Sequence, residues 1–364
     1  MTSAAPMGAC DGNKDTVAGE RSAAEKPYWV PFAHGARDCG DVWQEWQRLS
    51  ADAPPFLQPE FFDLTRPIAD PAGEPYLAVA VRAGRVAGVL PVTLHGPDLH
   101  PLRSEHSPGF DFWGDSTALS AIWEALRADP RWERFVLGHI PAQSPLATEL
   151  PMLARRWGCF IKTSPSHGVP YFSLPGFQEQ LDGKFRTNVR RCTRKAGDLS
   201  FERHTAPSPA EFADALAIEA MAWKGGAGTS IGSDARLTHF YRALLDLFGP
   251  RGSMSLNFVT VAGQRIACLF TMEDGHTLYA AKIGFDPAYA AISPGHLMVA
   301  QTAADAERRG LKVFDFLGEA AEWKLKWTDR LREHLWVVVH RPSLRGYARF
   351  VWRKARESRL GKTP

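Results

Sequence analysis

The sequence has few cysteines and no closely spaced pair of them: five are scattered over 364 residues. This spacing excludes a zinc ribbon or a redox motif and is typical of a cytoplasmic protein with reduced thiols. No two of the 12 histidines stand four residues apart, so the sequence contains no helical metal pair. We therefore expect no metal.

Long apolar runs and a strong excess of charge are also missing. No apolar run approaches ~18 residues, the length of a membrane-spanning helix. The formal net charge of +3 is too small to indicate a nucleic-acid partner for the whole molecule. Lys14 and Glu20 stand where a secretory signal peptide would need an apolar core. We expect a disordered leader over residues 1–26, because this segment is rich in Ala, Gly, Ser and charge.

What the sequence does contain is one pattern that occurs twice. Strand-like apolar runs flank an Ala-Gly turn at 76–94 and again at 254–271, and the second strands begin alike at Arg85 and Arg265. A Ser-Pro-Gly triplet, a helical pattern and a short strand follow each hairpin at nearly the same offset. This order predicts a tandem duplication. The predicted parts are domains over 27–170 and 171–340, joined near the Pro/Gly/Ser-rich stretch 165–176, and a basic tail over 341–364.

The second copy can be followed in more detail. Strands are predicted at 254–261, 265–272 and 276–283, followed by a loop, a helix over 295–309 and a return strand over 311–317. Amphipathic helices are predicted over 176–196 and 209–223. Three antiparallel strands, a helix and a return strand make a mixed α+β sheet. In the first copy, the return strand is expected at 134–140.

Four segments of the second half, taken in order, resemble the GNAT superfamily of N-acyltransferases. They are KFRTNVRRCTRKAG (184–197), AMAWKGGAGTSI (220–231), GFDPAYAAISPGHLM (284–298) and FDFLGEAAEWKLKW (314–327). The likeness is greatest to the CelD-like or BioF2-like acetyltransferase branch, relatives of the FemABX peptidyltransferases. It implies tandem GNAT-like mixed sheets flanked by helices, with an open cleft only in the second half and a first half that has lost cofactor binding. One departure is that Ser293-Pro294-Gly295 replaces the glycine-rich loop of the superfamily.

This triplet has two interpretations. A helix N-terminus exposes unpaired amides that bind phosphate, and Gly295 lets the backbone approach an anion closely. The alternative is an ordinary serine cap followed by proline in the first turn. The resemblance places the pyrophosphate of an acyl-CoA here, and it implies cofactor-binding roles for Lys282, Ile283, Ser293, Gly295, His296 and Leu297.

The chemistry that the resemblance implies is direct attack of an amine on the thioester carbonyl of acyl-CoA. Such a reaction needs a base, an oxyanion donor and an acid for the leaving thiolate. We expect main-chain amides near Lys282 and Ile283 as oxyanion donors, where the 276–283 strand splays from the return strand. Glu319 and Asp315 are the candidate bases. The alternative for Asp315 is a strand residue satisfied by a backbone or arginine partner.

The acceptor site is expected around three features. Lys324 and Trp327 stand three residues apart on one side of a helical turn, the stretch 223–230 is too glycine-rich for a helix interior, and the helix over 176–196 has a basic face. Their structural alternatives are a packed tryptophan beside a solvated lysine, a plain connection and a solvated face. The candidate substrate-binding residues are Trp223, Lys224, Gly228, Thr229, Asp286, Lys324, Trp327, Arg186 and Arg190.

The favoured function is therefore transfer of an acyl group, expected to be acetyl, to an amine of an envelope or polysaccharide precursor or of a small metabolite. The alternatives are an aminoacyl-tRNA-dependent transferase of FemABX type and a non-catalytic scaffold of an envelope polysaccharide complex. The basic tail either rests on an anionic membrane or packs its aromatic residues on the domain. We expect a cytoplasmic protein with at most peripheral membrane contact, and no nucleic-acid partner.

Overall fold

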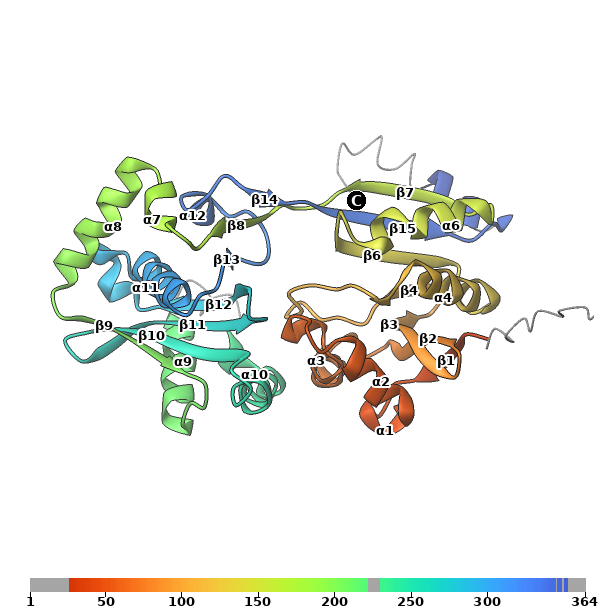
Figure 1. Ribbon diagram of the computed structural model, residues 1–364, viewed down its shortest axis with the longest axis horizontal. Coiled ribbons are helices and arrows are strands. Elements are labelled where there is room, and N and C mark those ends of the chain that lie inside the picture. Colours follow the sequence, from red (N-terminus) through yellow and green to blue (C-terminus); the bar gives the residue numbers. More distant parts are fainter. Residues whose placement is uncertain (1–25, 222–229, 345, 349, 353–364) are drawn as a thin grey trace, which may run out of the picture.

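The computed structural model describes residues 26–221, 230–344, 346–348 and 350–352, which fold into two halves (Figure 1). Each half is built on a mixed β-sheet flanked by helices. This arrangement confirms the predicted fold class. Among the described residues, no helix combines the length and apolar character needed to cross a bilayer.

The first sheet contains one parallel pair, β4 with β6, and its other neighbours are antiparallel. Its strands, in spatial order, are β1 (Tyr28–Pro31), β2 (Glu74–Arg82), β3 (Arg85–His95), β4 (Asp98–Pro101), β6 (Arg134–Pro141), β15 (His334–His340) and β7 (Phe160–Pro165), and β5 (Trp113–Gly114) pairs with β3. Its helices are α1 (Ala36–Cys39), α2 (Asp41–Leu49), α3 (Pro59–Thr65), α4 (Ser116–Ala128), α5 (Pro145–Thr148) and α6 (Leu150–Arg156), with 3₁₀ turns η1 (Pro55–Leu57) and η2 (Arg66–Ile68).

The second sheet also has one parallel pair, β12 with β13. Its strands, in spatial order, are β9 (Leu199–His204), β10 (Met254–Val261), β11 (Gln264–Glu273), β12 (Thr277–Phe285), β13 (Val313–Asp315), β8 (Val169–Ser173) and β14 (Leu331–Arg332). Its helices are α7 (Phe177–Gln180), α8 (Gly183–Ala196), α9 (Pro209–Met221), α10 (Ala235–Phe248), α11 (Pro294–Arg308) and α12 (Glu322–Leu325), with 3₁₀ turns η3 (Ile231–Ser233) and η4 (Pro287–Ile292).

The two hairpins that suggested a duplication have the same geometry. Both central residues of each turn have positive φ, 52° and 74° at Ala83-Gly84 and 49° and 77° at Ala262-Gly263, as a type I′ turn requires. Each hairpin also has a β-bulge at the third residue of its second strand, Ala87 or Ile266, which has no partner in the strand register. This register aligns Arg85 with Gln264, one residue before the Arg265 that the sequence pattern suggests.

The last strand of each half lies in the other half's sheet. β15 lies between β6 and β7 of the first sheet, and β8 holds the same place between β13 and β14 of the second. Figure 1 shows the segments β7–β8 and β14–β15 passing side by side from one half to the other. Residues 334–340, expected in the second domain, therefore complete the first sheet. The apolar pattern of a strand identifies its buried faces but not the sheet that it joins.

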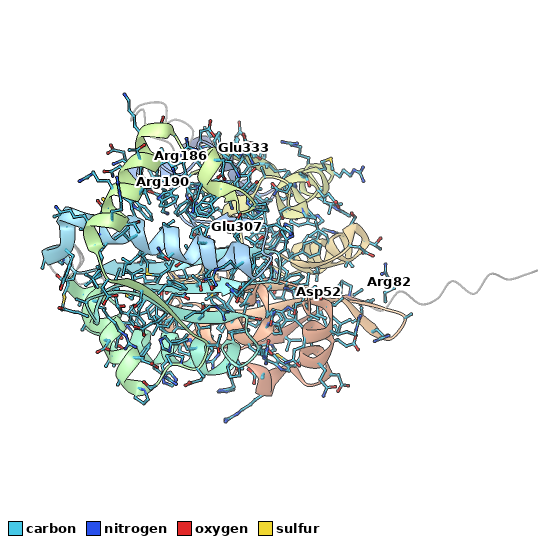
Figure 2. The ribbon with its side chains drawn as sticks, turned by 60° about the vertical axis from the view of Figure 1, so that its left-hand side comes forward. Asp52, Arg82, Arg186, Arg190, Glu307 and Glu333 are labelled. Atoms are coloured by element: carbon cyan, nitrogen blue, oxygen red, sulfur yellow. The ribbon has the colours of Figure 1, made fainter. Side chains whose placement is uncertain are left out.

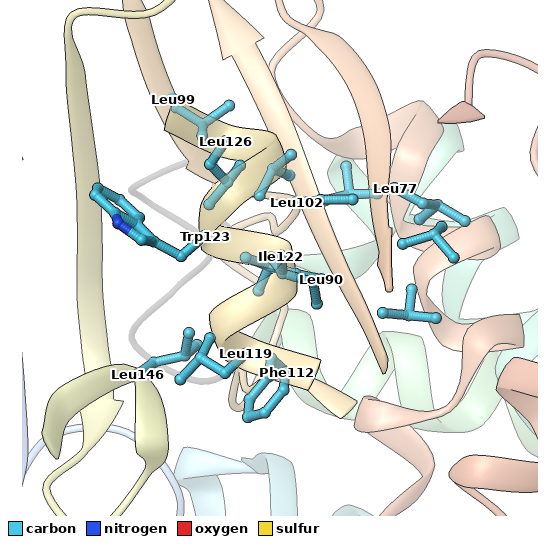
Figure 3. Close-up of a cluster of buried hydrophobic side chains, with 14 of the residues drawn as sticks. Leu77, Leu90, Leu99, Leu102, Phe112, Leu119, Ile122, Trp123, Leu126 and Leu146 are labelled. Carbon is cyan, nitrogen blue, oxygen red and sulfur yellow. The ribbon is translucent and has the colours of Figure 1, made fainter. Parts of the chain in front are cut away.

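Buried side chains form a core in each half and another that spans both. In the first half, α4 packs Leu119, Ile122, Trp123 and Leu126 on the sheet (Figure 3). In the second half, α8 and α11 contribute to a core on one face, and α9 and α10 to a core on the other. The α9/α10 core includes Phe56 and Phe61 of the first half, and the Phe56 ring lies 5.0 Å from that of Tyr279. The halves are therefore packed together through apolar contacts.

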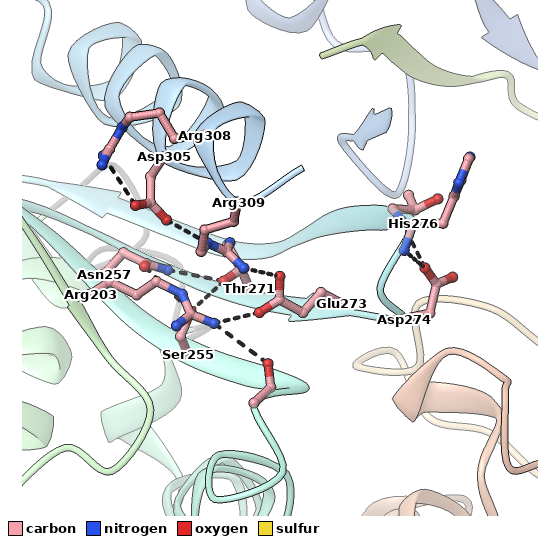
Figure 4. Close-up of polar contacts among 12 residues, drawn as sticks. Arg203, Ser255, Asn257, Thr271, Glu273, Asp274, His276, Asp305, Arg308 and Arg309 are labelled. Carbon is pink, nitrogen blue, oxygen red and sulfur yellow. Dashed lines mark hydrogen bonds and ion pairs between the residues drawn. The ribbon is translucent and has the colours of Figure 1, made fainter. Parts of the chain in front are cut away.

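A chain of ion pairs anchors the end of α11 to the sheet. Glu273 of β11 pairs with Arg203 of β9 and, at 2.6 Å, with Arg309 just after α11 (Figure 4). Arg309 Nε also contacts Asp305 Oδ2 at 2.8 Å. Because Glu273 and Asp305 are largely withdrawn from water, solvent screens these pairs less than surface pairs.

The helix predicted over 176–196 is interrupted. It consists of α7 and α8, separated by Leu181 and Asp182. Asp182 Oδ1 accepts hydrogen bonds from the amides of Lys184 at 3.0 Å and Phe185 at 3.1 Å. An aspartate in this role starts a new helix, so the apolar periodicity continues across a real break.

Candidate functional site

A cavity of about 1710 Å³ lies between the two halves. The start of α11 contributes Ser293, Pro294, Gly295 and His296 to its lining. Its opposite wall, however, belongs to the first half and includes the segment from Arg103 to Pro108, together with His139 and His167. The site is therefore shared between the halves rather than contained in the second domain.

The two strands of the parallel pair separate at this cavity. Pairing of β12 with β13 ends at Tyr279 and Asp315, and β12 continues to Phe285 without that partner. A bulge at Ala281 shifts the register with β11 at the same point. Lys282 and Ile283 follow directly and line the cavity, where the resemblance places the thioester. Bulges commonly lie beside active sites, where they redirect the chain.

The start of α11 also faces the cavity. Ser293 adopts a left-handed conformation (φ 53°, ψ 61°), and its side chain makes no capping hydrogen bond. Its carbonyl instead accepts the amides of His296 at 3.0 Å and Leu297 at 3.1 Å. Because Pro294 has no N–H, Gly295 has the first amide of the helix, and this amide has no partner among the described residues. The serine-cap alternative does not describe this geometry.

His296 and Trp327 act together in the structure. Trp327 Nε1 donates to His296 Nδ1 at 3.1 Å, and the indole is buried against Phe172 and Phe185. Burial lowers the pKa of His296 to about 4, so the ring is neutral and its proton is on Nε2. His296 lines the cavity, whereas Trp327 and Leu297 lie in the core behind it. Trp327 thus orients His296. The side chains of Trp327 and Leu297, both predicted to contact a ligand, do not line the cavity.

Lys324 lines the cavity and also holds the loop that follows β13. Its Nζ donates to the carbonyls of Leu317 at 2.5 Å and Glu319 at 3.0 Å. Leu317 and Gly318 both have positive φ, 50° and 58°, so the ammonium holds a strained loop. Burial lowers the pKa of Lys324 to about 8. The loop presents the Glu319 side chain to the cavity.

The two candidate bases have different surroundings. Asp315 is 2% exposed, and its carboxylate contacts Arg332 at 3.3 Å and accepts the Leu317 amide at 2.8 Å. Burial raises the pKa of Asp315 to about 6. Asp315 does not line the cavity, whereas Glu319 is exposed within it. The geometry of Asp315 is that of the structural alternative: a strand carboxylate satisfied by arginine and backbone.

The other predicted substrate contacts are dispersed. Asp286 lies outside the cavity lining and caps η4, with Oδ1 accepting the Ala288 amide at 2.8 Å. Arg186 and Arg190 are on α8, at the outer end of the second half, and do not line the cavity (Figure 2). The remaining residues, Trp223, Lys224, Gly228 and Thr229, are outside the described residues.

The start of the basic tail packs on the first half. The rings of Tyr347 and Phe350 lie 5.2 and 5.7 Å from that of Phe160 on β7. This contact corresponds to the packing alternative for these two aromatic residues. Membrane contact through the tail stays a prediction.

Sequence reasoning missed the first-half wall of the cavity. Arg103, His106, His139, His167 and His334 are far apart in the chain, and no spacing motif joins them. His167 precedes β8 and His334 begins β15, the two strands that each join the sheet of the other half. This arrangement brings both histidines beside His139. The one local signal was the first Ser-Pro-Gly triplet, which begins beside His106 in the cavity wall but does not start a helix.

Comparisons with known proteins agree with this architecture. Residues 183–325 match the family model of the acetyltransferase (GNAT) domain. The solved structure of FemX is similar, with a TM-score of 0.57 and 10% identity over 81% of this chain and 95% of that one. A DUF2156 domain from Agrobacterium fabrum gives a TM-score of 0.56 at 10% identity, covering 86% and 95% of the two chains.

A conserved protein of unknown function from Bacteroides thetaiotaomicron has the same fold, with a TM-score of 0.57 at 12% identity and coverage of 82% and 97%. No curated protein matches the sequence. At these identities the structural likeness shows a shared fold, and the domain match places a GNAT-type acetyltransferase segment in the second half. The CelD-like or BioF2-like branch stays a prediction.

Proposed function

We propose that the protein is an acyl-CoA-dependent N-acyltransferase, with acetyl-CoA as the expected donor. The acceptor is an amine of an envelope or polysaccharide precursor or of a small metabolite. One observation carries this proposal: the segment that matches the GNAT domain contains β12, the start of α11 and the loop of Glu319, and all three face one cavity.

The donor would lie along the second half. Its pyrophosphate would sit at the start of α11, where the unpaired amide of Gly295 and the positive end of the helix dipole favour an anion. The thioester would then lie beyond the end of β12–β13 pairing, beside Lys282 and Ile283. The position of Gly295 in the cavity lining supports this orientation, because glycine has no side chain of its own to cover its amide.

The reaction follows from these positions. The amine nitrogen attacks the thioester carbon and forms the C–N bond, and the carbonyl oxygen becomes an oxyanion near the main chain at Lys282 and Ile283. Glu319 accepts the proton of the amine, directly or through a water molecule. The C–S bond then breaks, and the CoA thiolate leaves and takes up a proton.

Glu319 is favoured over Asp315 as the base because of access. The carboxylate of Asp315 is held by Arg332 and the Leu317 amide, away from the cavity. Glu319 lies in the cavity on a loop whose carbonyls are fixed by Lys324. A fixed loop places a base reproducibly while leaving its side chain free to reach the amine.

The test is a donor screen on the full chain. Calorimetric titration with CoA, acetyl-CoA and longer acyl-CoAs should show binding, and a ligand at 100 times its Kd should stabilise the fold by about 2.7 kcal/mol. Release of free thiol should then depend on an added amine. Transfer from aminoacyl-tRNA without binding of any CoA thioester would establish the FemABX-type alternative. Absence of both activities would favour the scaffold.

A further inference from the structure

Arg103 is a cation in the cavity wall that has no anionic partner among the described residues. Its Nη1 donates to the Gly138 carbonyl at 3.0 Å and its Nη2 to the Ser107 carbonyl at 3.3 Å. In the part of the chain that the structure describes, no carboxylate pairs with it, and burial lowers its pKa. A guanidinium has five N–H donors, so three are left for other partners. A cation withdrawn from water is unfavourable unless an anion compensates it.

Three histidines lie beside this guanidinium. The ring of His167 lies 4.4 Å from that of His139 and 5.9 Å from that of His334, and all three line the cavity. His139 Nδ1 pairs with Ser166 Oγ at 2.6 Å. The Nδ1 of His167 is buried and has no hydrogen-bond partner among the described residues. The cluster therefore has hydrogen-bonding capacity that the described protein groups do not use.

The hydrogen bond of His334 fixes its tautomer. Its Nδ1 donates to the Arg332 carbonyl at 3.1 Å, which leaves Nε2 as an acceptor in the neutral ring. Burial lowers the pKa of all three histidines, and the charge of Arg103 lowers them further. At neutral pH the three imidazoles are therefore uncharged, and Arg103 carries the positive charge of this cluster.

The cluster faces the loop of the second half that would carry the base. Both Glu319 and Lys324 act electrostatically on His167, and both line the same cavity. The first half thus contributes a guanidinium with free donors to the cavity that contains the proposed reaction centre. An acceptor bound in this cavity would have its amine near Glu319 and another group near Arg103.

We propose that Arg103, together with His139 and His167, binds an anionic oxygen group, carboxylate or phosphate, on the acceptor amine. The inference deepens the proposed function and rests on it for the identity of the acceptor. Arginine is suited to such a group because its fork of N–H donors matches the paired oxygens of a carboxylate or phosphate. The anion would neutralise the buried charge, which no described carboxylate does.

The first test measures binding without catalysis. Inorganic phosphate and succinate are titrated into the full chain, into Arg103→Gln and into the control Arg308→Gln, whose arginine is exposed on α11. At least one anion should raise Tm more in the wild type and the control than in Arg103→Gln, which keeps the proposed anion site at the start of α11. Arg103→Lys, which keeps the charge without the fork, should bind more weakly than wild type. An equal response of Arg103→Gln and wild type to both anions would overturn the proposal.

The second test uses paired acceptors with acetyl-CoA. Glycine is compared with glycinamide, and glucosamine 6-phosphate with glucosamine, which distinguishes carboxylate from phosphate. A charged hydrogen bond corresponds to roughly a 10- to 150-fold preference in kcat/KM for the anionic member. In Arg103→Gln this ratio should fall towards one. A ratio unchanged by the substitution would overturn the inference.

A CoA titration of the same variants separates the outcomes. Wild-type CoA affinity in Arg103→Gln is expected, because the guanidinium belongs to the first half of the cavity lining and the start of α11 to the second. A selective loss of CoA affinity would instead assign Arg103 to a phosphate of the donor and overturn the acceptor assignment. If wild type binds no CoA thioester but Arg103 still governs the anion response, the proposed function fails and the anion site stands.

Discussion

Replacement of Gly295 gives the sharpest test of the donor site. A Cβ added at this position would lie 3.4 Å from Cδ1 and 3.7 Å from Cε1 of Phe285, which is close to ordinary contact. Gly295→Ala should therefore fold, with a stability within about 1 kcal/mol of wild type, since alanine is favoured over glycine in a helix by ~0.5–1 kcal/mol. Gly295→Val adds two methyl groups beside Phe285, at the cavity wall where the phosphate is expected.

The magnitude follows from the amide that the valine would shield. A hydrogen bond to a charged group contributes roughly 1.5–3 kcal/mol, which corresponds to about 10- to 150-fold in Kd. Steric exclusion of the phosphate adds to this loss, so we expect Gly295→Val to abolish measurable CoA binding. The CoA affinity of Gly295→Ala should lie between those of the wild type and Gly295→Val. Calorimetric titration of CoA, with melting curves alongside, measures both quantities. Wild-type CoA affinity in a folded Gly295→Val protein would refute the phosphate site.

Substitutions of Ser293 provide the matched control. If this serine capped α11, Ser293→Ala would cost about 1 kcal/mol of stability. The side chain makes no capping bond, so the melting temperature and the CoA affinity should both stay close to wild type. Ser293→Gly should raise stability, because glycine adopts the left-handed conformation of this position without strain. A loss of about 1 kcal/mol in Ser293→Ala would instead support the interpretation of Ser293 as the cap of α11.

Three further predictions concern titratable groups. Glu319→Gln should lower turnover by roughly 100-fold or more and leave CoA affinity intact; near-normal turnover across pH would place the base elsewhere, with Asp315 next. The pKa of Asp315 is raised from 3.8 to about 6, so between these pH values the folded state binds a proton that the unfolded state has lost. The contribution of Asp315 to stability therefore falls as pH rises from 3.8 to about 6, and Asp315→Asn should show a smaller fall in Tm over this range. The pKa of His296 is lowered from 6.5 to about 4, so its contribution makes stability rise with pH over that range, and His296→Gln should show a weaker rise; an unchanged slope would contradict the burial of this ring.

Local elements were predictable from the sequence because their signals are local. The hairpin around Ala262-Gly263 and the helix from Pro294 to Arg308 follow from turn residues and apolar periodicity. The break at Asp182 had a local signal as well, an aspartate able to cap a helix, but the continuous apolar pattern concealed it.

The cavity wall of the first half was not predictable in this way. It depends on which sheet the strand His334–His340 joins, and that choice is made by contacts distant in the chain. The roles of Trp327 and Lys324 were equally inaccessible, because a partner such as the His296 ring or the Leu317 carbonyl becomes visible only in three dimensions. The sequence therefore located the second-half side of the cavity and missed the first-half side.

The exchange of β8 and β15 has a consequence for the origin of the molecule. If the chain were cut between β8 and β9, each piece would carry six strand positions of its own sheet and the one strand that completes its neighbour's. Two identical pieces of this kind would assemble as a domain-swapped homodimer with a shared cavity at the two-fold axis. Gene fusion of such a dimer yields the present topology directly, and it frees one wall of the cavity to diverge while the other retains the ancestral chemistry.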